Sequence, residues 1–330
     1  MFESSNFFYV IELRRPAPPS TTRAAAEKLA SQARVVRRAR LWYTFAMKQR
    51  VVVTGACGRI IERILPGLAA QFDLTLVDIR DTDFDGKPVA GVHTIDLLEN
   101  DRTAYRELFR GHDAVIHSGF VRSTSGGSAG TGGGSEDFWS EHDNVRMAHN
   151  VMQACVEAGV KRAVVVSSNH AADLYEPLIH SGDVFGVTPE MAPYSDNYYG
   201  WAKVCYESLG HLFATGRENG GARLENVQLR IGAPRDNDLD TIEPGDIRSM
   251  RRALGAYISA RDETQLFVKS ITTPDIRNEY GVPFQVFYGI SANSTRFWDI
   301  SNAKRVIGYE PEDDSIVVFR DQIARITAGR

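Results

Sequence analysis

Short apolar runs alternate with amphipathic stretches from Arg50 onward. Six runs predict buried strands: RVVVT, LTLVDI, VHTIDL, DAVIHS, RAVVVSS and NVQLRIG. Helices are expected at residues 58–70, 138–158 and 199–215; one face of the second carries Val145, Ala148, Val151, Met152 and Cys155. Continuous apolar strands that alternate with helices are typical of a parallel sheet covered on both faces. The pattern predicts an α/β, doubly wound Rossmann-type fold that binds ligands at the carboxyl ends of its strands.

Residues 1–46 differ from the rest of the chain. They hold seven arginines against three glutamates and include RRPAPPS, a poor helix or strand sequence. Since MKQRVVVTG at Met47 reads like a start before the first strand, we expect residues 1–46 to be a disordered N-terminal extension. A targeting peptide or a docking arm is the alternative. Residues 47–330 are expected to form one domain with a small C-terminal portion that covers the ligand.

Two polar segments interrupt the alternation of strands and helices. Residues 122–137 are rich in glycine and serine, which favours a flexible loop over the sheet edge. Residues 178–197 form a second long polar segment, which predicts a lid or a binding loop. A surface insertion without a role is the alternative for both segments.

Composition and charge exclude several classes of function. With 330 residues, 43% of them hydrophobic, the chain can bury a substantial core. A net charge of −4 gives no reason to expect nucleic-acid binding, and no apolar run reaches the roughly 18 residues of a membrane span. Cys57, Cys155 and Cys205 have no metal-ligand spacing and indicate reduced thiols. We therefore expect a cytoplasmic protein without a metal.

A glycine-containing turn, TGACGRII, directly follows the first strand. Gly55 and Gly58 let the backbone approach a pyrophosphate, which the next helix N-terminus can bind. A third glycine is replaced by Ile61, which predicts a slightly displaced helix. Asp78 ends the second strand 20 residues after Gly58, where a carboxylate accepts ribose hydroxyls and repels a 2′-phosphate. The turn thus predicts a dinucleotide site that prefers NAD over NADP, although nearby Arg80 leaves that choice less clear.

A tyrosine and a lysine four residues apart form the second candidate site. Tyr199 and Lys203, in YYGWAK, project from one helix face. A nearby ammonium favours the phenolate, so the tyrosine can act as a base near neutral pH. The strand RAVVVSS ends in Ser167, Ser168 and then Asn169 and His170, at the edge where ligands bind.

These motifs resemble a known family over residues 47–330. TGACG, DAVIHSG, SSN and YGWAK, in this order, are similar to the extended short-chain dehydrogenase/reductase superfamily, also called the NAD-dependent epimerase/dehydratase family. SSNH, LRIGAP, ISARD and FWDISNAKRVIGYEP resemble its uronate dehydrogenase group. The resemblance implies an NAD-dependent oxidoreductase that oxidises C1 of a sugar or sugar acid to a lactone, and a homodimer.

The resemblance also implies a role for individual residues. Catalysis falls on Ser168, Tyr199 and Lys203, with Tyr199 removing the proton of the reacting hydroxyl. The cofactor would contact Gly55, Cys57, Gly58, Arg59, Ile60, Asp78, Ile79, Asp96, Leu97, Ser118, Gly119, Phe120, Tyr199, Lys203 and Ile231. The substrate would contact Arg122, Ser123, Asn144, Ser168, Asn169, His170 and Arg252, with Arg251 or Arg248 as alternatives to Arg252.

The chain departs from the family after the fourth strand. The family has a pair of glycines and then a serine there, whereas this chain has HSGFVRSTSGG, with Phe120 and Arg122. A bulky ring and a cation change the shape and charge of a substrate site. This departure is compatible with a phosphorylated or differently oriented sugar acid as substrate. The alternative functions are a nucleotide-sugar epimerase or dehydratase and a non-catalytic dinucleotide sensor, the second of which Ile61 and this altered loop would favour.

Overall fold

The computed structural model of the chain describes residues 48–122 and 135–328, which excludes the predicted extension at 1–46 and Ser123. The compact unit that begins at Gln49 contains the sheet and the site. Among the described residues, none of the helices has the length and apolar character that a bilayer crossing requires.

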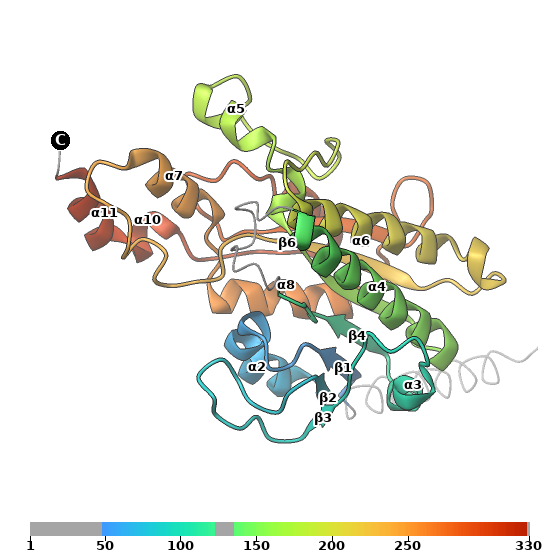
Figure 1. Ribbon diagram of the computed structural model, residues 1–330. Coiled ribbons are helices and arrows are strands. Elements are labelled where there is room, and N and C mark those ends of the chain that lie inside the picture. Colours follow the sequence, from blue (N-terminus) through green and yellow to red (C-terminus); the bar gives the residue numbers. More distant parts are fainter. Residues whose placement is uncertain (1–47, 123–134, 329–330) are drawn as a thin grey trace, which may run out of the picture. The chain divides into compact units, whose positions relative to one another are not determined.

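The unit is built on a parallel sheet of seven described strands (Figure 1). The strands are β1 (Arg50–Thr54), β2 (Asp73–Asp78), β3 (Val92–Thr94), β4 (Ala114–His117), β5 (Arg162–Ser168), β6 (Glu225–Ile231) and β7 (Phe284–Gly289). Their spatial order is β3-β2-β1-β4-β5-β6-β7, and every neighbouring pair is parallel. The predicted doubly wound Rossmann-type fold and its six strands are confirmed, whereas β7 was not predicted.

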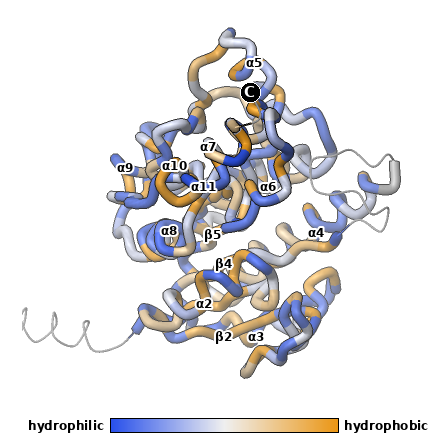
Figure 2. The backbone as a smooth tube through the Cα atoms, turned by 90° about the vertical axis from the view of Figure 1, so that its left-hand side faces the viewer, coloured by the Kyte–Doolittle hydropathy of each residue, from blue (hydrophilic) through white to orange (hydrophobic). Residues whose placement is uncertain are grey.

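Helices cover both faces of the sheet because the buried strands are apolar on both sides. Val51 and Val53 of β1 pack with α2 (Arg59–Gln71), α8 (Ala260–Thr272) and α9 (Ser301–Ile307). Val52 points to the other face, against α3 (Thr103–Phe109), α4 (Ser135–Ala158) and α6 (Tyr198–Thr215). The blue and orange positions along α2 in Figure 2 reflect this division, since Ile61, Ile64 and Leu68 are its buried residues.

The order of the strands fixes where a ligand binds. From β1 the chain moves outward to β2 and β3, and then returns to place β4 on the opposite side of β1. Thr54 at the end of β1 pairs with His117 at the end of β4. In such sheets the crevice at this reversal point, outside the carboxyl ends of the strands, is the ligand site.

A smaller apolar cluster lies after β6. Leu254 of α7 (Ile247–Ala256), Ile326 of α11 (Arg320–Thr327) and Phe319, which lies between α10 (Ser315–Val318) and α11, belong to it. Two further short helical segments are η1 (Asn169–Ala172) and α5 (Tyr175–Ser181), both between β5 and α6, and η2 (Arg217–Asn219) follows α6.

Three predicted boundaries were wrong. The long helix α4 begins at Ser135, so the Gly/Ser-rich segment predicted to run to Asp137 ends earlier. The long polar segment predicted from residue 178 begins inside α5, which ends where Gly182 adopts a left-handed conformation with φ 86°. Strand β3 ends at Thr94, so Asp96 and Leu97 lie in the following loop.

Candidate functional site

The glycine-containing turn after β1 passes very close to the chain after β4. Gly55 has φ +70°, and a Cβ there would lie 2.5 Å from the backbone of Ser118 and Gly119. Only glycine therefore fits this position. Gly58 is the N-cap of α2 and has no side-chain cap, so the first N–H groups of the helix are open to a bound anion.

The predicted third glycine position is part of the core. Ile61 is fully buried against the apolar face of the sheet that carries Val51 and Val53. Ile61 lies in the first turn of α2, and its side chain is buried in the core of the protein.

The Asp78 carboxylate is held by the glycine-containing turn. Asp78 Oδ2 accepts a hydrogen bond from Cys57 N at 2.9 Å, and Oδ1 accepts one from Arg80 N at 3.3 Å. The Cys57 thiol donates to the Arg80 carbonyl at 3.3 Å, and burial raises the pKa of this thiol to about 11. The sulfur of Cys57 is thus packed under the turn.

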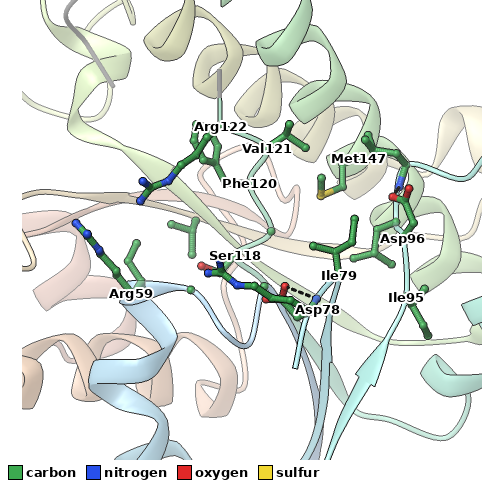
Figure 3. Close-up of a pocket in the computed structure, with 18 of the residues that line it drawn as sticks. Arg59, Asp78, Ile79, Ile95, Asp96, Ser118, Phe120, Val121, Arg122 and Met147 are labelled. Carbon is green, nitrogen blue, oxygen red and sulfur yellow. Dashed lines mark hydrogen bonds between the residues drawn. The ribbon is translucent and has the colours of Figure 1, made fainter. Parts of the chain in front are cut away.

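A cavity of about 520 Å³ lies at the reversal point of the sheet (Figure 3). Most of the residues predicted to contact the cofactor line it: Gly55, Gly58, Arg59, Ile60, Asp78, Ile79, Asp96, Leu97, Ser118, Gly119, Phe120, Tyr199 and Lys203. Arg122 and Arg80 also line it, whereas the predicted residues Cys57 and Ile231 do not. The sequence did not identify Phe84, Ile95, Leu98, Val121, Met147 and Val166, because an apolar residue on a cavity wall has the same pattern as a core residue.

The cavity has two ends that differ in chemistry. Ile79, Asp96 and Leu97 enclose one end, near the carboxyl ends of β2 and β3. Phe120 lies across the cavity from Asp96 in Figure 3 and packs edge to face on Tyr199, which lines the cavity with Lys203. An apolar slot, open helix N–H groups and a polar reactive end fit an extended dinucleotide.

Helix α6 positions the tyrosine and the lysine. The Asn197 side chain caps the helix by accepting a hydrogen bond from Gly200 N at 2.9 Å. Lys203 is buried, and its Nζ donates to the Val166 carbonyl at 3.2 Å. The same Nζ lies 5.3 Å from the centre of the Tyr199 ring.

Burial dominates the acidity of both groups. Desolvation by the surrounding protein raises the pKa of Tyr199 to about 12, although a hydrogen bond with Ser168 opposes the rise. Burial lowers the pKa of Lys203 to about 8, against the opposite effect of Glu141. The depression of the Tyr199 pKa that the sequence predicted is therefore not found in this structure, because the cost of a buried phenolate outweighs the hydrogen bond with Ser168.

The polar end of β5 converges on the tyrosine. Ser168 is the last residue of β5, and its Oγ accepts a hydrogen bond from His170 N at 3.3 Å. The His170 ring centre lies 5.5 Å from that of Tyr199, edge to face. His170 Nδ1 is 2.6 Å from Asp173 Oδ2, which fixes the orientation of the imidazole. The predicted residues Ser168, His170 and Tyr199 therefore lie close together.

Arg252 joins the same region through Asn169. With the Asn169 amide oriented to satisfy both neighbours, its oxygen accepts from Arg252 Nη2 at 3.0 Å and its nitrogen donates to the Ile231 carbonyl at 3.0 Å. Arg252 Nε also donates to Glu176 at 3.1 Å. The alternatives Arg248 and Arg251 are exposed, so the structure brings Arg252, rather than either of them, to Asn169.

Asn144 supports the loop after β4. Its side chain accepts a hydrogen bond from Val121 N at 2.6 Å and donates one to the Val121 carbonyl at 2.9 Å. On this fixed loop, the Phe120 ring lies 5.6 Å from the Tyr199 ring, edge to face. The Arg122 guanidinium extends in the other direction and lies 4.7 Å from the Phe84 ring centre.

Comparisons with known proteins agree with this geometry. A family model described as NAD(P)H-binding matches residues 55–203. The NAD-dependent glucose-6-phosphate dehydrogenase of Haloferax volcanii is 28% identical and covers 82% of this chain and 95% of its own. The uronate dehydrogenase of Pseudomonas syringae pv. tomato is 27% identical over 83% of this chain and 85% of its own. A solved mutated uronate dehydrogenase is 26% identical, covers 85% of this chain and 87% of its own, and has a TM-score of 0.63.

These matches cover both the dinucleotide cavity and the helix that carries Tyr199 and Lys203. The cavity fits NAD, and the matched family binds this class of cofactor. The chain is therefore similar to NAD-dependent sugar and uronate dehydrogenases, and these comparisons support an NAD-dependent enzyme that acts on a CH–OH group.

Proposed function

We propose that the protein is an NAD-dependent dehydrogenase that oxidises C1 of a sugar or sugar acid to a lactone. The observation that carries the proposal is the convergence of Ser168, His170 and Tyr199 at one end of a dinucleotide cavity. The names of the relatives, which are sugar and uronate dehydrogenases, support a sugar as substrate.

The residues around the cavity suggest how the cofactor is held. Gly55, Gly58 and the first turn of α2 would hold the pyrophosphate, and Asp78 would hold the adenosine ribose. When bound, NAD supplies the acceptor for the hydride that leaves the carbinol carbon.

The proton of the reacting hydroxyl is assigned to Tyr199. Ser168, which is hydrogen-bonded to Tyr199, would also form a hydrogen bond with the substrate hydroxyl and orient it toward Tyr199. Lys203 carries a positive charge below pH about 8, and this charge favours the phenolate. The hydroxyl group would lose its proton and C1 would lose its hydrogen as a hydride, so the hemiacetal and NAD⁺ give the lactone, NADH and H⁺.

Three side chains near Tyr199 are suited to recognise a sugar. His170 and Asn169 offer polar groups, and Arg252 offers a guanidinium that can bind a carboxylate. Glu176 already pairs with Arg252 at 3.1 Å, so a sugar carboxylate would compete with this partner. Phe120 narrows the same region, because its ring packs against Tyr199. A neutral aldose is thus as compatible with the site as a hexuronate.

The experiment is an NAD-reduction screen with hexuronates, aldoses and their phosphates. The wild type is expected to form NADH with at least one of them, and Tyr199→Phe should lower kcat/KM by at least about a hundredfold. Tyr280→Phe, at a tyrosine that is 82% exposed, is the matched control and should keep full activity. No NADH from any compound would contradict the proposal, and a nucleotide that copurifies with tightly bound NAD would instead favour a nucleotide-sugar epimerase.

We also propose a homodimer formed through α4 and α6. Trp139 on α4 and Tyr198 and Leu212 on α6 are large apolar side chains that remain exposed. Exposed apolar side chains on two adjacent helices are typical of an interface. Light scattering on Trp139→Glu should show a shift toward monomer; a wild type that is already monomeric would contradict the dimer.

A further inference from the structure

The Arg252 guanidinium is held by side chains from three other segments of the chain. Its Nε donates to Glu176 Oε2 of α5 at 3.1 Å, and its Nη2 donates to the side-chain oxygen of Asn169 at 3.0 Å. Its central carbon lies 5.4 Å from the centre of the buried Trp298 ring. Arg252 is therefore bound within the protein before any ligand arrives.

The pair formed by Arg252 and Glu176 is partly buried. The two side chains are 23% and 22% exposed. The second carboxylate oxygen, Glu176 Oε1, lies 3.7 Å from His180 Nε2 on the same helix. Because salt screens a partly buried pair less than a surface pair, an incoming carboxylate would compete with a firmly held partner. Glu176 thus takes the place on Arg252 that a sugar carboxylate would need.

A second carboxylate lies close to the tyrosine at the reacting end of the cavity. Asp173 Oδ2 is 2.6 Å from His170 Nδ1, and the His170 ring packs edge to face on the Tyr199 ring. Asp173 Oδ1 is buried and has no hydrogen-bond donor among the described residues. The segment that follows β5 therefore carries two carboxylates, those of Asp173 and Glu176, against the guanidinium of Arg252.

These charges separate a neutral sugar from a hexuronate. A hexuronate brings a further carboxylate, which the two protein carboxylates repel and which finds Arg252 already paired. A neutral aldose avoids both costs. A repulsive contact of this kind can discriminate between two ligands just as an attractive contact can.

We propose that Glu176 occupies the carboxylate-binding position of Arg252, so that the enzyme selects a neutral aldose over the matching hexuronate. In this arrangement Arg252 is a positioning residue, which holds the Asn169 amide so that its nitrogen donates to the Ile231 carbonyl at 3.0 Å. The inference rests on the proposed function, since it concerns the sugar that Tyr199 would oxidise.

The test uses pairs of sugars that differ only at C6: glucose with glucuronate, and galactose with galacturonate. NAD reduction gives kcat/KM for each sugar, and NMR titration in the presence of NADH gives the affinity without turnover. The wild type is expected to favour the neutral sugar of at least one pair by about tenfold or more in both quantities. Glu176→Gln removes the competing charge and should strengthen binding of that pair's hexuronate by roughly tenfold, while the neutral sugar should change by less than about threefold.

Two further variants show whether the gain comes from Arg252. Glu279→Gln removes an exposed carboxylate from the loop before β7 and should change the binding of neither sugar. The double variant Glu176→Gln with Arg252→Gln should lose the gain in hexuronate binding, since no guanidinium is then set free. Thermal unfolding checks that each variant is folded.

Three results would overturn the inference. A wild type that binds each hexuronate as tightly as its neutral partner would show that Glu176 does not exclude a carboxylate. Unchanged hexuronate binding in Glu176→Gln would leave the pair with a structural role only. A gain that persists in the double variant would show that the carboxylate binds elsewhere than at Arg252. NADH from none of the sugars would instead refute the proposed function, while the NMR comparison, which needs no turnover, would still decide between the two sugars.

Discussion

Two buried side chains of opposite charge lie behind the reactive end of the cavity. Glu141 is 4% exposed and Lys203 is 3% exposed. Glu141 Oε2 accepts a hydrogen bond from Asn144 at 3.1 Å, and burial raises the pKa of Glu141 to about 7. The neighbouring His117 is neutral, because burial lowers its pKa to about 3. Glu141 and Lys203 are thus the charged groups that this region contributes to the electrostatic field near Tyr199.

Removal of the Glu141 charge should change the pH dependence of activity. The carboxylate raises the pKa of Lys203, so Glu141→Gln should lower that pKa further. Lys203 then loses its charge at lower pH, and the alkaline limb of the profile of kcat/KM against pH should move to lower pH. Glu107→Gln, at an exposed site, should leave the limb in place. A limb that does not move in Glu141→Gln would show that Lys203 does not control it.

A methyl group at Gly55 should abolish cofactor binding. Gly55→Ala places a Cβ 2.5 Å from the backbone of Ser118 and Gly119, at a backbone φ of +70°. Gly86→Ala is the control, since Gly86 has φ +78° but open space around it and should lose only about 1–2 kcal/mol of stability. Calorimetry with NADH and thermal unfolding would measure both variants. Normal NADH binding by Gly55→Ala would exclude the close approach of these two loops.

At the level of elements, a buried ion pair fixes α6 against the sheet. Arg230 of β6 donates to both oxygens of Glu207 at 2.7 Å, and Ser167 of β5 donates to Glu207 at 2.9 Å. Arg230 also donates to the Tyr288 hydroxyl of β7 at 2.9 Å. These contacts join three strands to the helix that carries Tyr199 and Lys203.

Loss of one partner of this pair should be costly. Arg230→Met leaves the Glu207 carboxylate buried without its counter-ion, which should lower the free energy of unfolding by about 3–5 kcal/mol. Arg110→Met breaks an exposed pair and should cost less than about 1 kcal/mol. Urea unfolding would measure both, and the double variant Arg230→Met with Glu207→Leu should recover part of the loss. Equal free energies of unfolding for Arg230→Met and Arg110→Met would contradict the stabilising role of the Arg230–Glu207 pair.

The sequence predicted the elements whose pattern is local. Six strands were identified because strands buried on both faces are continuously apolar. Strand β7 was not identified, since its FQVFYG run is interrupted by Gln285, which is buried through a hydrogen bond to the Ile276 carbonyl at 3.1 Å. Helix α3 is only seven residues long and too short to show a clear period. Contacts that depend on the tertiary fold were thus missed.

The candidate site residues that follow a strand could also be predicted from the local sequence pattern, whereas contacts between distant segments could not. The carboxyl ends of adjacent parallel strands meet at one edge, so Gly55, Asp78, Ser118 and Ser168 could be assigned to the site from their positions after apolar runs. The contact between Arg122 and Phe84 could not be predicted, because it depends on the conformation of the loop between β2 and β3. The pairing of Arg252 with Glu176 likewise needs α5, which the sequence pattern did not show.

On the scale of the whole molecule, the fold, the cavity and the relatives describe one enzyme class, and the reacting carbon is its central question. The most direct measurement uses sugars and hexuronates with deuterium at C1, incubated with the protein and NAD. Oxidation at C1 should give a lactone without the label and NADH that carries one deuterium for each lactone formed. Deuterium that remains on C1 of a converted sugar, or NADH without deuterium, would contradict oxidation at C1.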